Sequence, residues 1–190
     1  EKGVRVLDTE EDLKNLPEGQ GTVVIRSHGV SRYIYDILNS RKVNVVDATC
    51  PFVKKIHKIV DEHSRAGEAV IIIGSPVHPE VEGIRGWGNG DTVVVENEAD
   101  AEDYNLPEGK KLCIVSQTTF NYNKFQELVE KILKKGYDSS VLNTICNATQ
   151  ERQVEAMRIA SQVDVMLVIG GKHSSNTQKL YDICRKECKN

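Results

Sequence analysis

The sequence predicts a parallel α/β fold. Short runs rich in β-branched residues alternate along the chain with stretches of helical pattern, which is typical of βαβ units. The 190 residues, 39% of them hydrophobic, are enough to bury a core without disulfides. Small and reactive residues follow six of the apolar runs directly. Because ligands bind beyond the carboxyl ends of parallel strands, this pattern indicates one central site.

Eight runs are predicted as strands, each rich in apolar residues and most of them in β-branched ones. They are residues 4–7, 22–25, 44–46, 69–73, 92–95, 112–115, 140–142 and 165–169. Helices are expected in the gaps. Two have clear ends: residues 51–66, with Pro51 in the first turn and Gly67 as a stop, and residues 121–135, stopped by Gly136. Two more are expected at about 148–162 and from Ser174 onward.

The charge pattern excludes several partners. The 25 basic and 28 acidic residues give a net charge of -3, and no basic run is dense enough for a nucleic-acid or membrane footprint. No stretch reaches the ~18 apolar residues of a membrane span, and the charged start is not a signal peptide. We therefore expect a cytoplasmic protein.

The five cysteines are an odd number in a chain without secretory features, so a disulfide framework is not expected. Cys50 and Cys146 lie where a strand gives way to a helix, whose N-terminus stabilises a thiolate that can bind metal. The alternative for each is a small buried residue. Cys113 lies inside an apolar strand pattern and is predicted to be core. Cys184 and Cys188 share a helix face and are interpreted as packing rather than as a metal pair.

His28 and His78 lie in loops after strands, where an imidazole can donate to an anion, although a lone loop histidine is often only solvated. Glu80 follows two residues after His78 and could pass protons into the same pocket. No role is assigned to His57 and His63.

Two further loops offer hydroxyl groups. Ser174, Ser175 and Asn176 open a helix, so they form either a phosphate cradle or an ordinary N-cap. Thr118 and Thr119 are likewise either a capping pair or hydroxyls directed at a polar substrate. No Gly-x-Gly-x-x-Gly fingerprint supports dinucleotide binding.

Taken together, six motifs resemble the 4-hydroxy-3-methylbut-2-enyl diphosphate reductase family in order and spacing. The resemblance covers nearly the whole chain, and six motifs in sequence order are specific. The motifs are Ser27-His28-Gly29-Val30, Asp47-Ala48-Thr49-Cys50-Pro51, His78-Pro79-Glu80-Val81-Glu82-Gly83, Gln117-Thr118-Thr119, Ile145-Cys146-Asn147-Ala148-Thr149 with Arg152-Gln153, and Ser174-Ser175-Asn176.

The resemblance implies three similar α/β modules around a four-iron four-sulfur (4Fe-4S) cluster that three cysteines bind. The reaction it implies is the reductive dehydroxylation of 4-hydroxy-3-methylbut-2-enyl diphosphate to isopentenyl and dimethylallyl diphosphate, with electrons from a donor such as ferredoxin or flavodoxin. Carried over by motif, the ligands of the cluster are Cys50 and Cys146, the diphosphate contacts are His28, His78, Ser174, Ser175 and Asn176, Thr118 lies near the substrate hydroxyl, and Glu80 is the proton donor.

The sequence also departs from the family. The loop with the first cluster cysteine and the end of the third module are not found, so we expect a chain truncated at both ends and inactive by itself. It would comprise the end of a first module (1–46), a complete second module (47–143) and the start of a third (144–190). The alternatives are a diphosphate-binding module without a complete cluster, or an unrelated flavodoxin-like or sugar-phosphate-binding protein.

Overall fold

The computed structural model describes residues 3–188, and within them the strands form two parallel sheets. The first sheet pairs β1 (Thr22–Ile25) with β2 (Asn44–Asp47). The second has the order β4-β3-β5-β6, and its strands are β3 (Ala69–Ile73), β4 (Thr92–Val95), β5 (Leu112–Ser116) and β6 (Ser139–Val141). Every pairing is parallel, which confirms the predicted fold class.

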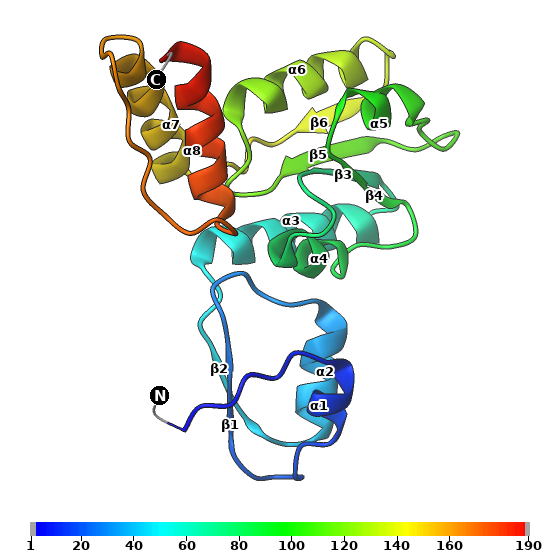
Figure 1. Cartoon of the computed structure of the whole chain (residues 1–190). Helices are drawn as coiled ribbons and strands as arrows, with labels where there is room; N and C mark the ends of the chain where they lie inside the picture. Colours follow the sequence, from blue (N-terminus) through cyan, green and yellow to red (C-terminus); the bar gives the residue numbers. More distant parts are fainter. Residues whose placement is uncertain (1–2, 189–190) are drawn as a thin grey trace.

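Helices cover both faces of the four-stranded sheet (Figure 1). One face packs against α3 (Pro51–Arg65) and α4 (Pro79–Arg85), and the other against α5 (Glu98–Asp103) and α6 (Tyr122–Leu133). The central strands β3 and β5 are therefore buried at every position, as their continuous apolar runs require.

The two-stranded sheet forms a separate, smaller unit with α1 (Glu10–Lys14) and α2 (Arg32–Ser40). Side chains from both helices pack with those of β1 in one small core. The opposite face of this sheet is open, and Val24 on β1 is 61% exposed. Figure 1 shows this unit below the larger sheet, with α3 and α4 between them.

The last two helices, α7 (Asn147–Ala160) and α8 (Ser175–Glu187), pack against each other (Figure 1). Cys184 and Cys188 lie buried between them with Ala160, as the packing interpretation predicts. No helix within residues 3–188 is long and apolar enough to cross a membrane.

The predicted helix ends are close to the observed ones. Pro51 is the first residue of α3, where its missing N–H is not needed. Gly67 and Gly136 follow α3 and α6 with φ of 82° and 76°, a backbone conformation that costs glycine little and stops a helix. The first-turn proline and the two stop glycines were therefore sufficient to place these helix ends.

Two predicted strands were wrong. Residues 4–7 and 165–169 form no regular secondary structure and pair with no strand in the described part of the chain. Several of their apolar side chains are exposed, among them Val4 at 86% and Ile169 at 92%, whereas Leu7, Met166 and Val168 pack against small cores. β-branched composition favours an extended backbone, but a strand also needs a neighbour whose hydrogen-bonding groups it can meet.

Candidate functional site

The loops that follow the strands lie against one another. The N–H of Cys50 donates to the carbonyl of Ser27 at 3.0 Å, which joins the loops after β1 and β2. The imidazole rings of His28 and His78 meet edge to face, with centroids 5.5 Å apart. The small unit and the four-stranded sheet thus contribute one histidine each to the same place.

Three more loops continue this set of contacts. The carboxylate of Glu80 binds Thr118, and the N–H of Cys146 donates to the Thr118 carbonyl at 3.0 Å. The hydroxyls of Thr119 and Ser175 lie 3.1 Å apart. All six reactive loops are therefore linked, in agreement with a single central site approached from several elements.

Gly29 makes the approach of the first loop possible. Its φ is 71°, and a Cβ at this position would lie 2.5 Å from Cε1 of His57. Only glycine fits, because a side chain would be strained by the backbone and would also collide with α3. The loop can therefore lie directly on α3 and present His28 beside His78.

Glu80 is a buried carboxyl group with one polar partner. Its side chain accepts from the N–H of Thr118 at 2.6 Å and from the Thr118 hydroxyl at 2.7 Å. Burial raises the pKa of Glu80, and the two hydrogen bonds from Thr118 oppose that rise without cancelling it. A carboxyl with a raised pKa holds its proton closer to neutral pH, as a general acid requires.

Burial lowers the pKa of both His28 and His78, and the nearby charge of Arg26 lowers each further. His78 is the N-cap of α4, and its Nδ1 accepts from the N–H of Glu80 at 3.2 Å. In the neutral ring this acceptor role places the proton on Nε2. His78 thus offers one N–H donor to a ligand.

The N-terminus of α8 brings several donors to the same region. Ser174 is the N-cap and accepts from the N–H of Thr177 at 3.3 Å. Two buried side-chain atoms, Nδ1 of His28 and Oδ1 of Asn176, have no hydrogen-bonding partner among the described residues. Because unpaired buried polar atoms are costly, these two atoms indicate a place that a polar ligand would satisfy.

Cys50 and Cys146 occupy equivalent positions, as N-caps of α3 and α7. Both thiols are half-buried, and neither forms a capping hydrogen bond, so both remain available as ligands. Cys113 is fully buried on β5, and burial raises its pKa to about 12, which confirms it as a core residue.

The type of ligand present suits an iron–sulfur cluster, but the number of cysteine ligands is smaller than the family resemblance implies. Thiolates at helix N-termini are the ligands that such clusters use. Within the described residues, however, no three His, Cys, Asp or Glu side chains gather as a metal group. Cys50 and Cys146 can therefore provide two of the three thiolates that the family resemblance implies.

Two basic residues near the imidazoles were not predicted as site residues. Arg26 directly follows β1, and its charge reaches both histidines. Lys179 on α8 acts on His78 in the same way. Lys179 lies four residues after Ser175 and thus on the same helix face, a spacing that could have identified it from the sequence.

Comparison with known proteins gives a consistent result. A model of the LytB protein family matches residues 1–190. A 4-hydroxy-3-methylbut-2-enyl diphosphate reductase from Caldanaerobacter subterraneus is 47% identical over 190 residues, which are 100% of this chain and 65% of that protein. The reductase of the same name from Thermoanaerobacter sp. is 50% identical over 189 residues, 100% of this chain and 64% of that protein. The chain thus spans about two thirds of the length of these relatives.

Solved structures of two reductases are also similar to this chain. The E-1-hydroxy-2-methyl-but-2-enyl-4-diphosphate reductase from Plasmodium falciparum superposes with a TM-score of 0.87 at 33% identity, over 93% of this chain and 56% of that one. A structure of (E)-4-hydroxy-3-methyl-but-2-enyl diphosphate reductase, described as the terminal enzyme of the non-mevalonate pathway, gives a TM-score of 0.65 at 40% identity. It is matched over 93% of this chain and 63% of that one.

Proposed function

This chain belongs to the LytB protein family, and from that membership we propose that the whole protein reduces 4-hydroxy-3-methylbut-2-enyl diphosphate to isopentenyl and dimethylallyl diphosphate. That reaction would be the last step of non-mevalonate isoprenoid synthesis, an oxidoreductase activity. The observation that most supports it is the buried Glu80–Thr118 pair, which lies beside two neutral imidazoles. This arrangement combines a proton donor with an anion site.

The diphosphate would bind between the histidines and α8. His28 and His78 offer ring N–H donors, and the N-terminus of α8 offers unpaired backbone N–H groups together with Ser174, Ser175 and Asn176. The positive charges of Arg26 and Lys179 act on the same region and add attraction for a polyanion.

Proton delivery would run through Glu80 and Thr118. Removal of a hydroxyl as water and its replacement by hydrogen consumes two electrons and two protons. Glu80, whose pKa burial raises, can supply a proton, and the Thr118 hydroxyl at 2.7 Å can orient the substrate hydroxyl or relay the proton. The surrounding loops exclude water, since Glu80 is only 3% exposed.

Cys50 and Cys146 would hold two irons of a 4Fe-4S cluster. When bound, such a cluster supplies electrons and an open iron position that can accept the substrate oxygen. An external donor such as ferredoxin or flavodoxin would provide the electrons. The cytoplasmic location and the division into modules 1–46, 47–143 and 144–190 stay predictions.

A second candidate applies to the 190 residues taken alone. Cys50 and Cys146 are two of the three cluster ligands that the resemblance implies. This polypeptide could therefore bind diphosphate without holding a complete cluster. An iron and sulfide assay after anaerobic reconstitution separates the two. Stoichiometric four-iron content would favour the reductase, and diphosphate binding without iron would favour the module.

The reductase proposal is tested by Glu80→Gln in the whole enzyme. We expect cluster content and substrate affinity to be kept and turnover to fall by roughly 10²–10⁴-fold, the usual loss for a general acid. Glu82→Gln is the matched control, because Glu82 lies on the same helix but is exposed. Near-normal turnover of Glu80→Gln would remove Glu80 from the mechanism.

A further inference from the structure

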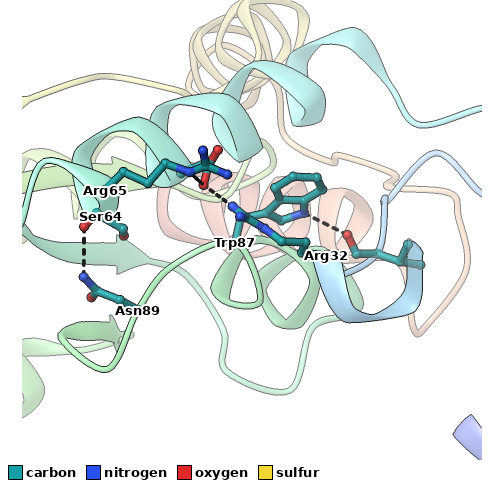
Figure 2. A network of polar contacts seen from close by, with 7 residues as sticks. Arg32, Ser64, Arg65, Trp87 and Asn89 are labelled. Carbon is teal, nitrogen blue, oxygen red and sulfur yellow. Dashed lines mark hydrogen bonds and ion pairs between the residues drawn. The ribbon is translucent and has the colours of Figure 1, made fainter. Parts of the chain in front are cut away.

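We propose that Trp87 and Arg32 act as a clamp that positions His28 for the diphosphate. Neither residue touches the ligand site. Both lie where the small β1–β2 unit meets α3 and α4, and Figure 2 shows them with their partners. The proposal rests on the diphosphate site described above and adds the positioning residues that hold its two halves together.

The first link is a hydrogen bond at the far end of α4. The helix carries His78 as its N-cap and Gly86 as its C-cap, and Trp87 follows directly. The indole Nε1–H of Trp87 donates to the carbonyl of Val30 at 2.9 Å. Val30 lies two residues after His28, so one short helix fixes His78 at one end and holds the His28 loop at the other.

The second link is the close packing of the His28 loop against two glycines at and near the end of α4. A Cβ on Gly86 would lie 2.1 Å from Cβ of Ser31. Further back on the same helix, a Cβ on Gly83 would lie 3.5 Å from the carbonyl group of Gly29. The loop therefore lies directly on Gly83 and Gly86, and the distance of approach is set by backbone atoms and the Cβ of Ser31 rather than by the ends of flexible side chains.

The third link is Arg32, the first residue of α2. Its guanidinium forms an ion pair with Asp61 on α3, and it lies 5.1 Å from the centroid of the Trp87 ring. The imidazole of His57 stacks on the same indole, with centroids 5.1 Å apart and an angle of 18° between the rings. The indole is thus held by a cation, an aromatic ring and a hydrogen bond from three elements.

These contacts predict a specific kinetic effect. The clamp fixes His28 relative to His78, whereas the hydrogen bonds between Glu80 and Thr118 join α4 to the loop after β5 and do not involve the small unit. Loosening the clamp should therefore weaken diphosphate binding while the proton donor keeps its geometry. A residue that only stabilised the fold would not separate KM from kcat in this way.

The test uses the whole, cluster-loaded enzyme and the variant Trp87→Phe, which keeps an aromatic ring and removes the donor to Val30. We expect KM to rise roughly three- to tenfold, the size of one lost hydrogen bond, with kcat within about twofold of wild type. The affinity for inorganic diphosphate, measured by calorimetry, should fall by the same factor. Arg32→Ala should change both quantities in the same direction.

Arg65→Ala is the matched control. Arg65 also binds Asp61, at 2.8 Å, but from within α3 and with 68% of its side chain exposed, so it does not join the two units. Its removal should leave KM and diphosphate affinity unchanged. If Trp87→Phe fails to fold, Arg32→Ala decides the question, because Arg32 lies nearer the surface.

The outcomes separate the two proposals. An active wild-type enzyme whose Trp87→Phe and Arg32→Ala variants keep normal KM and diphosphate affinity would overturn the clamp and leave the reductase proposal standing. A fall in kcat and melting temperature with unchanged KM would also overturn it, since that result indicates only a structural role. A wild-type enzyme that neither binds diphosphate nor turns over substrate would overturn both.

Discussion

Glu80 and His78 lie two residues apart, and burial acts on them in opposite directions. It raises the pKa of the carboxyl group and lowers that of the imidazole, so both side chains favour the neutral form. A neutral acid can give up a proton, and a neutral imidazole can still donate one N–H. These two side chains therefore add no charge to that of Arg26 and Lys179 until the anionic substrate enters.

Diphosphate binding should consequently take up protons. A bound polyanion favours the charged imidazole and raises the pKa of His28 and His78 from the lowered values of the free protein. Over the pH range in which the parts of the site stay assembled, affinity for inorganic diphosphate should therefore increase as the pH falls through the pKa values of the complex, and level off below those of the free protein. Calorimetry in buffers of different ionisation enthalpy measures this uptake.

The control for proton uptake is His78→Asn, which retains a donor but cannot titrate. Its proton uptake should be smaller than that of wild type by up to one proton per diphosphate. Because diphosphate itself titrates, only the difference between the two proteins is informative. Equal uptake by both proteins would show that His78 does not change its protonation on binding.

The surroundings of Cys50, Cys146 and Cys113 predict which substitutions remove the iron–sulfur cluster. In the whole enzyme, Cys50→Ser and Cys146→Ser should each abolish the visible absorption of the cluster, because both residues cap helices beside the site. Cys113→Ser should keep the absorption, since Cys113 is buried in the sheet core. A full cluster in Cys146→Ser would contradict the assignment.

Five of the six motifs lie together in the fold because each follows a strand of a parallel sheet, a relation that periodicity and strand-end loops reveal. The sixth, Ser174-Ser175-Asn176, follows no strand in the described part of the chain and reaches the site at the start of α8. The clamp was not predictable in the same way. Trp87, Arg32 and Asp61 come from three different elements, and nothing in their local sequence indicates that they meet. Spacing within one element is visible in a sequence, whereas contacts between elements are not.

Helices and strands differ in how well local sequence determines them. Helix ends were predicted closely because caps, Pro51 and Gly136 act within a few residues of the end they define. Residues 165–169 were wrongly predicted as a strand although their pattern is strongly apolar, because strand formation depends on a partner from elsewhere. The other six strand predictions were confirmed, because each of those strands has a parallel partner.

A buried amide on helix α7 binds the backbone at the start of α6. Gln153 accepts from the N–H of Tyr122 at 3.1 Å and donates to the carbonyl of Phe120 at 3.0 Å. Gln153→Leu would leave two backbone groups without partners in a buried place and should lower the free energy of unfolding by roughly 2–3 kcal/mol in urea titrations. Gln150→Leu, at a half-buried position on the same helix, should change it far less. Equal stabilities would contradict this role.

The complete site depends on the assembly of separate parts. His28 comes from the β1–β2 unit, Glu80 and Thr118 from the four-stranded sheet, and Ser175 from the α7–α8 pair. Among the described residues, the four-stranded sheet carries Glu80 and His78, whereas the other proposed diphosphate contacts come from the β1–β2 unit and from the start of α8. Conditions that loosen the contacts between the parts should therefore reduce binding before the individual cores unfold.

Acid is one such condition, because His57 lies between the two units. It packs against Gly29 and stacks on Trp87, and burial lowers its pKa to about 4. Between pH 6.5 and about 4 the unfolded chain binds a proton at His57 that the folded chain does not. The stabilising contribution of neutral His57 is thus present above pH 6.5 and is lost as the pH falls, by about 3 kcal/mol at pH 4.

Glu80 acts in the opposite sense, since its raised pKa makes the free energy of unfolding fall as the pH rises above 4.5.

The contributions of His57 and Glu80 can be separated with His57→Gln, which removes the titrating ring. Urea unfolding of this variant at pH 7 and pH 5 should show a smaller loss of stability on acidification than wild type shows. The same substitution at His173, which is exposed, should keep the wild-type pH dependence. An identical pH dependence in His57→Gln and wild type would mean that the junction between the two units is not what acid weakens.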